Sequence, residues 1–262
     1  ETTLPIPNPV TLQPGTLAHV AYVGRVTAPR AVPQAANFRK EVRPLAPGYS
    51  VGHRRVTAGS IGAFVTRSDG YLYVLSNNHV LANTNRGKKN DVILQPGKLD
   101  GGRHPKHLIG WLEHFQELAA VGNTIDAALA SVSDELDYEV SYNGVDLVGV
   151  ADAVDVKERV WKVGRTTGHT TGHVTAFDVD NVEVDYSDEG DGSLVYSFDS
   201  QIEIKGTAGK HFSRGGDSGS LILNADNHAV GLLFAGADET RITYANPIRL
   251  VLNAFGAKLI LS

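Results

Sequence analysis

The chain contains no cysteine and no methionine among its 262 residues. Without cysteine there is no disulfide, no thiolate zinc site and no cysteine nucleophile, so packing alone must hold the fold together. We therefore expect a cytoplasmic protein, with secretion after processing as the alternative, since no signal-peptide pattern is visible. Long apolar runs and runs of basic residues are also missing, and the net charge is only −5. These absences argue against a membrane or a nucleic acid as partner.

Proline is scarce except at the start, where residues 1–48 hold eight of the eleven prolines. Proline fixes φ and removes a backbone donor, so this segment does not read as regular sheet. We predict that residues 1–54 form an arm that wraps the body or links to something upstream, with one helical or extended element around Leu17–Val26. A disordered tail is the alternative.

From about Val56 onward, short runs of β-branched and aromatic residues alternate with Gly, Asn and Asp turns. A series of about a dozen short strands is typical of an all-β barrel or sandwich. Only the segment 247–255 reads helical, because its apolar residues follow a proline at helical spacing. The predicted strands are 60–65, 71–75, 91–94, 109–112, 127–132, 145–150, 160–163, 173–177, 182–186, 194–198, 220–223, 230–234 and 242–244.

The turn Gly-Gly-Asp-Ser-Gly-Ser at 215–220 places Ser218 between glycines and after an aspartate. A serine hydroxyl is a poor nucleophile at neutral pH, so it needs a general base and N–H donors for the oxyanion that forms. The flanking glycines let backbone amides point inward. His79 is the candidate base, in Ser-Asn-Asn-His-Val, and Asp126 is the candidate carboxylate that orients it, directly before the apolar run 127–130.

The chain order His79, Asp126, Ser218 is that of chymotrypsin-type enzymes and not that of subtilisins or α/β-hydrolases. The three segments resemble those of the trypsin-like (chymotrypsin-fold) serine peptidases, and Ser-Asn-Asn-His-Val is most similar to the cysteine-free, bacterial-type branch. The segment Gly-Arg-Thr-Thr-Gly at 164–168 is similar to a hairpin of bacterial secreted members such as the α-lytic and streptogrisin types. The resemblance extends from residue 55 to residue 255 or thereabouts.

The resemblance implies an all-β fold of two six-stranded antiparallel β-barrels, followed by a C-terminal helix and preceded by the Pro-rich arm. The first barrel would occupy residues 55–145 and carry His79 and Asp126. The second would occupy residues 146–262, with the helix, and carry Ser218. The active site would then lie in the cleft between the two barrels.

The resemblance also assigns roles around the catalytic serine. The backbone N–H groups of Gly216 and Ser218 would form the oxyanion hole. Asp217 would point into the second barrel, where a buried carboxylate must be paired. The family pattern implies an Arg165–Asp217 ion pair that pre-forms the oxyanion loop without N-terminal cleavage. The alternative is that Arg165 is a surface hairpin residue.

For the substrate pocket, the resemblance places Phe212 at the base of the primary pocket. The wall strand would be Phe234, Ala235 and Gly236, whose backbone would pair with an extended substrate as an added strand. An apolar base favours a small or apolar substrate side chain over Lys or Arg. Acidic residues near the rim, Asp238 and Glu239, would work against that preference.

Two polar clusters resemble metal sites in composition only. The acidic stretch 178–191 has the residues of a calcium loop, but its alternation fits an exposed hairpin better. His104, His107 and His114 lack a fourth ligand at a recognisable spacing. We therefore expect no metal and no cofactor, and the sequence leaves the oligomeric state open.

These observations predict a serine endopeptidase that hydrolyses peptide bonds of protein or peptide substrates through an acyl-enzyme on Ser218. Esterase activity from the same site is one alternative. A catalytically silent binding or structural module is another, because fold does not imply function. We also hypothesise that the Pro-rich arm regulates activity by covering the cleft.

Overall fold

The computed structural model describes residues 23–28, 37–187 and 193–261. Most of the predicted Pro-rich arm, including most of the element expected around Leu17–Val26, lies outside the described residues, as does part of the acidic stretch, 188–192. Within the described ranges, no helix is long and apolar enough to cross a membrane.

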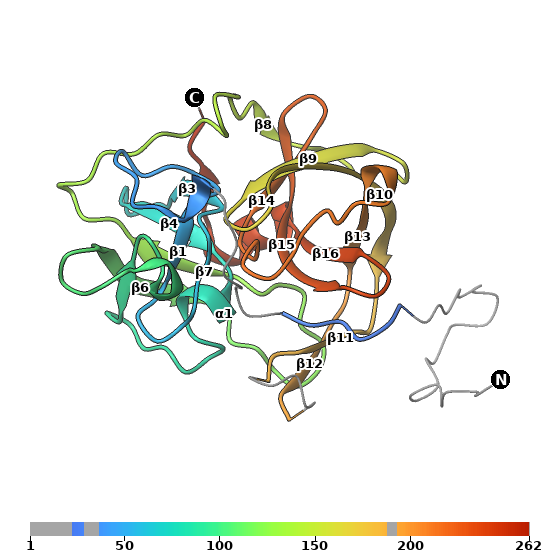
Figure 1. Ribbon diagram of the computed structural model, residues 1–262, viewed down its shortest axis with the longest axis horizontal. Coiled ribbons are helices and arrows are strands. Elements are labelled where there is room, and N and C mark those ends of the chain that lie inside the picture. The colour runs from blue at the N-terminus through green and yellow to red at the C-terminus, as the bar shows by residue number, and fades with distance from the viewer. Residues whose placement is uncertain (1–22, 29–36, 188–192, 262) are drawn as a thin grey trace.

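The chain folds into two large antiparallel sheets that lie side by side (Figure 1). The first sheet has eight strands in the order β17-β3-β4-β7-β6-β5-β1-β2. Its strands are β1 (Ser50–His53), β2 (Gly59–Ser60), β3 (Ala63–Thr66), β4 (Leu72–Ser76), β5 (Val92–Leu94), β6 (Leu108–Phe115), β7 (Ala128–Ser131) and β17 (Lys258–Leu259).

The second sheet closes on itself, because β14 pairs with both β9 and β15. Its order is β14-β9-β10-β13-β16-β15, with β8 added in parallel to β15. Its strands are β8 (Gly149–Val150), β9 (Arg159–Gly164), β10 (Gly168–Val179), β13 (Gln201–Gly206), β14 (Leu221–Asn224), β15 (His228–Ala237) and β16 (Ile242–Pro247). The closed six-stranded barrel and the curled first sheet confirm the predicted double-barrel fold.

The remaining elements are short. A two-stranded ribbon, β11 (Val182–Asp185) with β12 (Val195–Phe198), projects beside the second barrel. Val182 and Val184 are buried and Glu183 is exposed, as predicted, but Asp185 at the end of β11 is buried as well. The helical elements are α1 (Asn78–Leu81), α2 (Ile248–Phe255), η1 (Asn37–Arg39), η2 (Lys98–Asp100) and η3 (Thr207–Gly209).

Both faces of strands β3 and β4 are buried, and this explains how the barrels join. Phe64 and Val74 point into the core of the first sheet. Their neighbours Val65 and Leu75 point the other way, into a core shared with the second barrel and α2. Because side chains alternate between the faces of a strand, apolar residues on both faces bury the strand from two sides.

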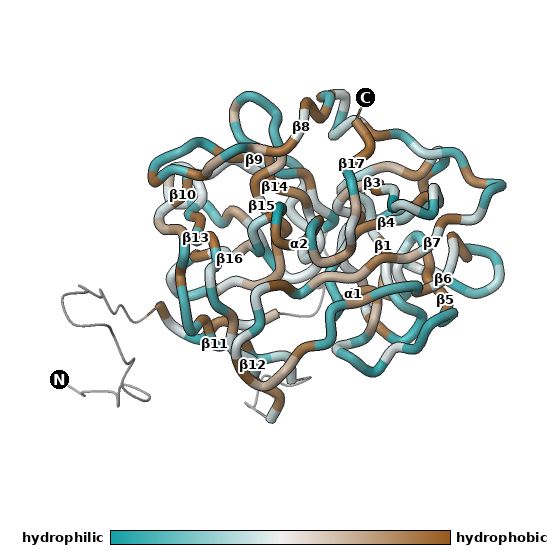
Figure 2. The backbone as a smooth tube through the Cα atoms, turned by 180° about the vertical axis from the view of Figure 1, so that it is seen from behind, coloured by the Kyte–Doolittle hydropathy of each residue, from teal (hydrophilic) through white to brown (hydrophobic). Residues whose placement is uncertain are grey.

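Helix α2 lies between the two sheets when the molecule is seen from behind (Figure 2). It begins after Pro247 and ends at Gly256, whose φ of 57° is in the left-handed region that glycine tolerates. The apolar residues at helical spacing are buried, as predicted. The chain then returns to the first sheet through β17, which pairs with β3.

Several predicted boundaries were wrong. The strand expected at 145–150 is reduced to Gly149–Val150, and β1, which lies inside the predicted arm, pairs in the first sheet. Strand β13 was missed because Gln201, Glu203 and Lys205 dilute its apolar residues, although alternation leaves two isoleucines buried. The turn of helix α1 was also missed, and it carries one of the candidate catalytic residues.

Candidate active site

His79 lies on α1, and a single residue, Asn77, separates this helix from the end of β4. The Asn77 side chain anchors this turn, because its Nδ2 donates to the Asp126 carbonyl at 2.7 Å. Asn78 Nδ2 donates to the Gln116 carbonyl at 2.6 Å. The two asparagines before the histidine are therefore buried anchors that hold a short helix at the edge of the cleft.

Asp126 lies directly before β7 and is completely buried. Its Oδ2 is 2.5 Å from His79 Nδ1, and its Oδ1 accepts from the His79 backbone N–H at 3.2 Å. Tyr186 Oη also donates to Oδ2, at 2.7 Å. All of these partners are donors, which suits an ionised carboxylate. The contact at Nδ1 places the ring proton there and leaves Nε2 of a neutral His79 as the basic nitrogen.

Tyr186 was not expected at the site. Its ring packs edge-on against His79, with centroids 5.4 Å apart. Burial raises the pKa of the Tyr186 hydroxyl well above its usual value, and the neighbouring Asp126 carboxylate raises it further. The hydroxyl therefore keeps its proton and remains a donor to Asp126. Tyr186 directly follows the ribbon strand β11, and no motif in the sequence marks it.

Ser218 lies in the turn before β14 and lines the same cleft as His79, a space of about 400 Å³ between the two sheets. The turn is pressed against the first sheet, because the Ser60 N–H donates to the Ser218 carbonyl at 2.8 Å. Gly216 and Gly219 have φ of 97° and 91°. These values favour glycine, and they explain why the serine is flanked by that residue.

The backbone amides expected to form the oxyanion hole are available. Within the described part of the chain, neither the Gly216 N–H nor the Ser218 N–H donates a hydrogen bond to another protein group. An N–H without an acceptor is costly unless solvent or a ligand satisfies it. The structure therefore places His79 in contact with Asp126 and puts Ser218 on the lining of the same cleft as His79.

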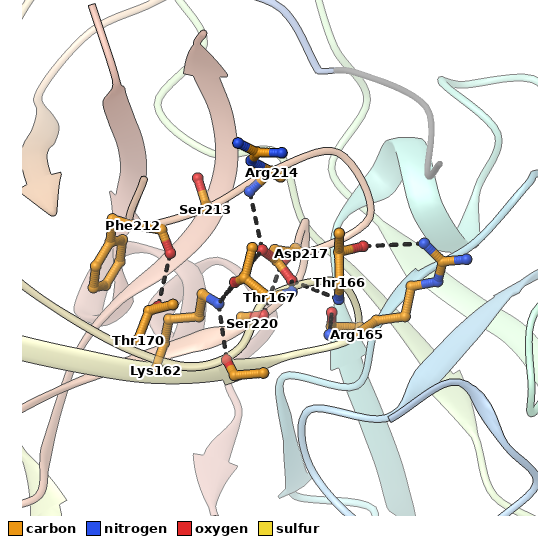
Figure 3. A network of polar contacts seen from close by, with 12 residues as sticks. Lys162, Arg165, Thr166, Thr167, Thr170, Phe212, Ser213, Arg214, Asp217 and Ser220 are labelled. Carbon is orange, nitrogen blue, oxygen red and sulfur yellow. Dashed lines mark hydrogen bonds and ion pairs between the residues drawn. The ribbon is translucent and has the colours of Figure 1, made fainter. Parts of the chain in front are cut away.

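The predicted Arg165–Asp217 ion pair is wrong. The cation at Asp217 is Lys162, whose Nζ is 3.4 Å from Oδ2, with both side chains fully buried (Figure 3). Asp217 also accepts hydrogen bonds from the N–H groups of Thr166, at 2.8 Å, and Thr167, at 3.1 Å. The hairpin backbone thus supplies much of the compensation that the family pattern assigns to an arginine.

Lys162 fits this position because its three N–H donors all find partners. Besides Asp217, the ammonium donates to the Thr167 hydroxyl and to the Gly168 carbonyl, the latter at 3.1 Å. Burial lowers the pKa of Lys162 from its usual value, while Asp217 acts in the opposite direction. Lys162 was not expected at the site, and it lies on β9 three positions before the arginine.

Arg165 is also completely buried, so it is not a surface hairpin residue. Its Nε and Nη2 donate to the two carboxylate oxygens of Asp100 at 2.7 and 2.6 Å. Asp100 belongs to η2, in the half of the chain that forms the first sheet, and Ser50 Oγ donates to it at 2.5 Å. Arg165 thus ties the β9–β10 hairpin of the second barrel to the first sheet.

The predicted pocket base was also wrong. Phe212 is fully buried in the core of the second barrel, and its carbonyl accepts from Thr170 Oγ1 at 2.7 Å. Phe234 is buried in another core cluster, so its side chain does not face the pocket. A small pocket of about 20 Å³ lies beside Ser218 instead. Its lining comprises His211, Ser213, Arg214, Ser218, Leu233, Ala235, Gly236, Ala237, Asp238 and Ile242.

A described part of the predicted arm, residues 23–28, reaches the wall strand. Thr27 forms an antiparallel bridge with Gly236, in which each residue donates its N–H to the carbonyl of the other at 3.0 Å. The next residue, Ala28, lines the cleft that contains His79 and Ser218. The described segment 23–28 therefore lies along the strand to which the sequence analysis assigned substrate binding.

Two further clusters were considered in the sequence, and part of the acidic one, at 188–191, lies outside the described residues. No group of three or more His, Asp or Glu that could hold a metal ion occurs within residues 23–28, 37–187 and 193–261. His107 contacts Glu41, whereas His114 contacts Arg67.

The family comparison matches the model described as Trypsin over residues 48–253. No curated protein matches the sequence significantly. Among solved structures, a glutamic acid specific serine protease that uses a histidine triad in substrate binding shares 24% identity, with a TM-score of 0.59 and coverage of 82% of this chain and 100% of that one. The chymotrypsin of Cellulomonas bogoriensis shares 19% identity (TM-score 0.56, coverage 84% and 100%). Protease A of Thermobifida fusca shares 19% identity (TM-score 0.58, coverage 84% and 100%).

Proposed function

Because the chain belongs to the trypsin family of serine peptidases, we propose that it is an endopeptidase that cleaves peptide bonds through an acyl-enzyme on Ser218. The observation that carries the proposal is the His79 Nδ1–Asp126 Oδ2 contact of 2.5 Å beside a cleft that Ser218 also lines. A histidine oriented by a buried carboxylate next to a serine is the arrangement that activates a hydroxyl for acyl transfer.

The reaction begins when the Ser218 hydroxyl attacks the carbonyl carbon of the scissile bond. His79 Nε2 takes the hydroxyl proton, and the Asp126 carboxylate stabilises the imidazolium that forms. The carbonyl oxygen becomes an oxyanion, and the Gly216 and Ser218 N–H groups bind it. Removing one such donor typically costs about 3 kcal/mol of transition-state stabilisation.

Collapse of this intermediate breaks the C–N bond. His79 gives its proton to the leaving amine, and the acyl group stays on Ser218 as an ester. A water molecule then attacks the ester carbonyl while His79 again takes a proton. The second intermediate releases the new carboxylate and restores the Ser218 hydroxyl.

Labelling with a fluorophosphonate and a peptide cleavage assay test this mechanism. Wild type should react covalently and cleave an unstructured protein substrate, and Ser218→Ala should do neither. Ser68→Ala, at an exposed loop position, is the matched control and should behave as wild type. Cleavage by Ser218→Ala would contradict the assignment. A wild-type protein that neither reacts nor cleaves would favour the silent-module alternative, and activity on esters alone would favour the esterase.

We propose that the primary pocket prefers an acidic side chain, in place of the small or apolar one expected from Phe212. The groups that support this are polar, namely the Ser213 hydroxyl, His211 and the Arg214 side chain at the rim. Burial lowers the pKa of His211, with a further contribution from nearby Arg214, and both effects favour the neutral ring. Asp238 opposes the preference, but its side chain is 82% exposed and solvent screens its charge.

Peptides that differ only in the residue before the scissile bond test the preference. The value of kcat/KM should be about tenfold higher or more for Asp or Glu than for Asn or Gln, as expected for a hydrogen-bonded charge. Arg214→Gln should remove most of that difference. The glutamic acid specific relative offers a precedent in the same fold. Preference for Leu or Ala at that position would contradict the proposal.

A further inference from the structure

The peptide that carries the Gly216 N–H has a fixed orientation, and its cause lies outside the catalytic turn. The Thr166 hydroxyl donates to the Gly215 carbonyl at 2.8 Å, deep between the turn and the β9–β10 hairpin. In a trans peptide the C=O and the following N–H point in opposite directions. Holding the Gly215 oxygen inward therefore turns the Gly216 N–H outward, away from the hairpin.

The direction of that hydroxyl proton is itself determined. Arg165 Nη1 donates to Thr166 Oγ1 at 3.0 Å (Figure 3). An arginine only donates, so Thr166 must accept there and has its single proton free for the Gly215 carbonyl. The guanidinium is held in turn by both carboxylate oxygens of Asp100. The two-point contact leaves little rotational freedom, because guanidinium and carboxylate are both planar.

We propose that Thr166 is the positioning residue of the oxyanion hole, and that the Asp100–Arg165 pair fixes its hydroxyl. The inference rests on the proposed function, because it assigns a role in stabilising the oxyanion at Gly216. Without the hydroxyl, the buried Gly215 carbonyl has no hydrogen-bond donor. Rotation of the Gly215–Gly216 peptide toward another donor then becomes energetically favourable. The alternative orientation presents a carbonyl oxygen, and not an N–H, to the oxyanion.

The test compares Thr166→Val, which removes the hydroxyl at nearly constant shape, with Thr166→Ser, which keeps it. Thr166→Val should lower kcat by a factor on the order of 10 to 1,000, the upper figure being the loss of a full donor, with little change in KM. Its affinity for a peptide boronate that forms a tetrahedral adduct should fall in parallel with kcat/KM. Thr166→Ser should restore both. Thr171→Val, an exposed threonine on the same hairpin, is the matched control.

The outcomes separate this inference from the proposed function. A wild-type protein with no peptidase activity overturns the proposed function, whatever the variants do. Active wild type with an equally active Thr166→Val overturns only the positioning role, as does a Thr166→Ser variant that is folded but as inactive as Thr166→Val. If Thr166→Val does not fold, Asp100→Asn replaces it, and it should show the same fall in kcat at constant KM, to a smaller extent. Unchanged kcat in Asp100→Asn would also overturn the role.

A second, independent observation concerns the arm segment 23–28. Gly236 has one N–H and one carbonyl, and Thr27 uses both of them. The segment is fixed on its other side, where the Asp185 N–H donates to the Val26 carbonyl at 3.1 Å and the Arg25 side chain pairs with the Asp185 carboxylate. Figure 1 shows the segment running beside β11.

We propose that segment 23–28 is an intramolecular competitor of the substrate. A peptide that adds to the wall strand at Gly236 needs the same N–H and carbonyl. It must therefore displace Thr27. The apparent KM then rises in inverse proportion to the fraction of molecules in which the arm is undocked. Val26, which is buried against the second barrel, adds apolar contact to the docked state. This inference also rests on the proposed function.

Two variants and two substrates test the competition. Thr27→Pro removes the N–H that binds Gly236, and Arg25→Glu places a carboxylate beside Asp185. Both should lower the KM of an extended tetrapeptide amide about three- to thirtyfold, the equivalent of one or two net hydrogen bonds, at constant kcat. The KM of a single-residue ester, which is too short to reach Gly236, should not change. An unchanged or higher tetrapeptide KM would show that the arm does not compete.

A measurement on the wild-type protein covers the case in which neither variant folds. Hydrogen exchange of the Thr27 amide should be slow in the free protein and fast when a tetrapeptide boronate saturates the site. Continued protection of that amide in the complex overturns the competition. Failure of the boronate to bind at all counts against the proposed function instead.

Discussion

At the scale of single residues, the site depends on donors that surround two buried carboxylates. Asp126 is held by His79, by the backbone and by Tyr186, and Asp217 by Lys162 and hairpin amides. A buried carboxylate without such partners would be protonated or would destabilise the fold. The triad segments were recognisable in the sequence because they are contiguous motifs. Tyr186 and Lys162 were not, because nothing near them in the chain indicates what they contact.

Tyr186→Phe should lower kcat/KM about tenfold. The variant removes a hydrogen bond to a charged group, a loss of about 1.5 kcal/mol or more, and it leaves Asp126 freer to move relative to His79. Steady-state kinetics on a peptide amide measures the change. Tyr196→Phe, whose ring packs against Tyr186 at a more exposed position, is the matched control. Equal kinetics in the two variants would contradict a role for the Tyr186 hydroxyl.

Lys162→Met should reduce the free energy of unfolding by about 3–5 kcal/mol, the usual result of removing one partner of a buried ion pair. Asp217 keeps its amide donors but loses the only cation that lies within ion-pair distance of it in the described ranges. Denaturation in urea provides the measurement. The comparison variant is Lys205→Met, which removes an exposed lysine from β13. A loss in Lys162→Met no greater than in Lys205→Met would contradict this account of the pair.

At the scale of elements, the catalytic turn is shaped by how closely the two sheets approach. A Cβ added to Gly219 would lie 2.5 Å from the Ser60 carbonyl oxygen and still closer to the Ser76 hydroxyl. The first sheet thus touches the turn that precedes β14. The motif Gly-Asp-Ser-Gly predicted a glycine there, but the steric reason for it comes from strands that are far away in the sequence.

Gly219→Ala should therefore be more destabilising than a change of backbone preference alone explains. The reference is Gly70→Ala, which also has a positive φ, of 79°, but has no atom within 4 Å of the added Cβ. We expect a cost of about 1–2 kcal/mol for Gly70→Ala and about 1–3 kcal/mol more for Gly219→Ala, from overpacking. Thermal or urea denaturation of both variants measures the difference. Equal costs would mean that the sheets can separate at this point without penalty.

At the scale of the whole molecule, the site belongs to neither barrel alone. His79 and Asp126 come from the first sheet and Ser218 from the turn before β14, in the second. The shared core, helix α2 and the Arg165–Asp100 ion pair hold the two together. Activity should accordingly be lost when the two barrels separate. The global stability of the protein therefore sets the conditions under which the site exists.

Stability should fall as the pH is lowered from 7 to 5. Burial lowers the pKa of His53 from 6.5, against the opposing effect of Asp91, and burial also lowers those of His114 and His211. Below pH 6.5 the unfolded chain binds protons that the folded protein excludes, so the free energy of unfolding decreases with falling pH until the folded pKa values are passed. Urea denaturation at several pH values measures the slope.

His53→Asn isolates the contribution of one group to that slope. The His53 ring is buried and its Nδ1 accepts from the Arg55 N–H at 3.1 Å, a role that the asparagine oxygen can take over. The variant should show a flatter pH dependence than wild type. His104→Asn, at an exposed position, should leave the slope unchanged. An unaltered slope in His53→Asn would mean that other groups cause the acid sensitivity.

The sequence by itself determined the family, the all-β fold, the helix predicted at 247–255 and the three candidate catalytic residues. These depend on short contiguous motifs, on alternation and on spacing, all of which can be read directly from the linear sequence. Only the tertiary structure decided the partners of the buried charges, the pocket lining and the position of segment 23–28. Those depend on contacts between groups that are far apart in the sequence, as between the side chains of Arg165 and Asp100 or the backbones of Thr27 and Gly236. A buried charge signals that it needs a partner, but packing alone determines which group supplies it.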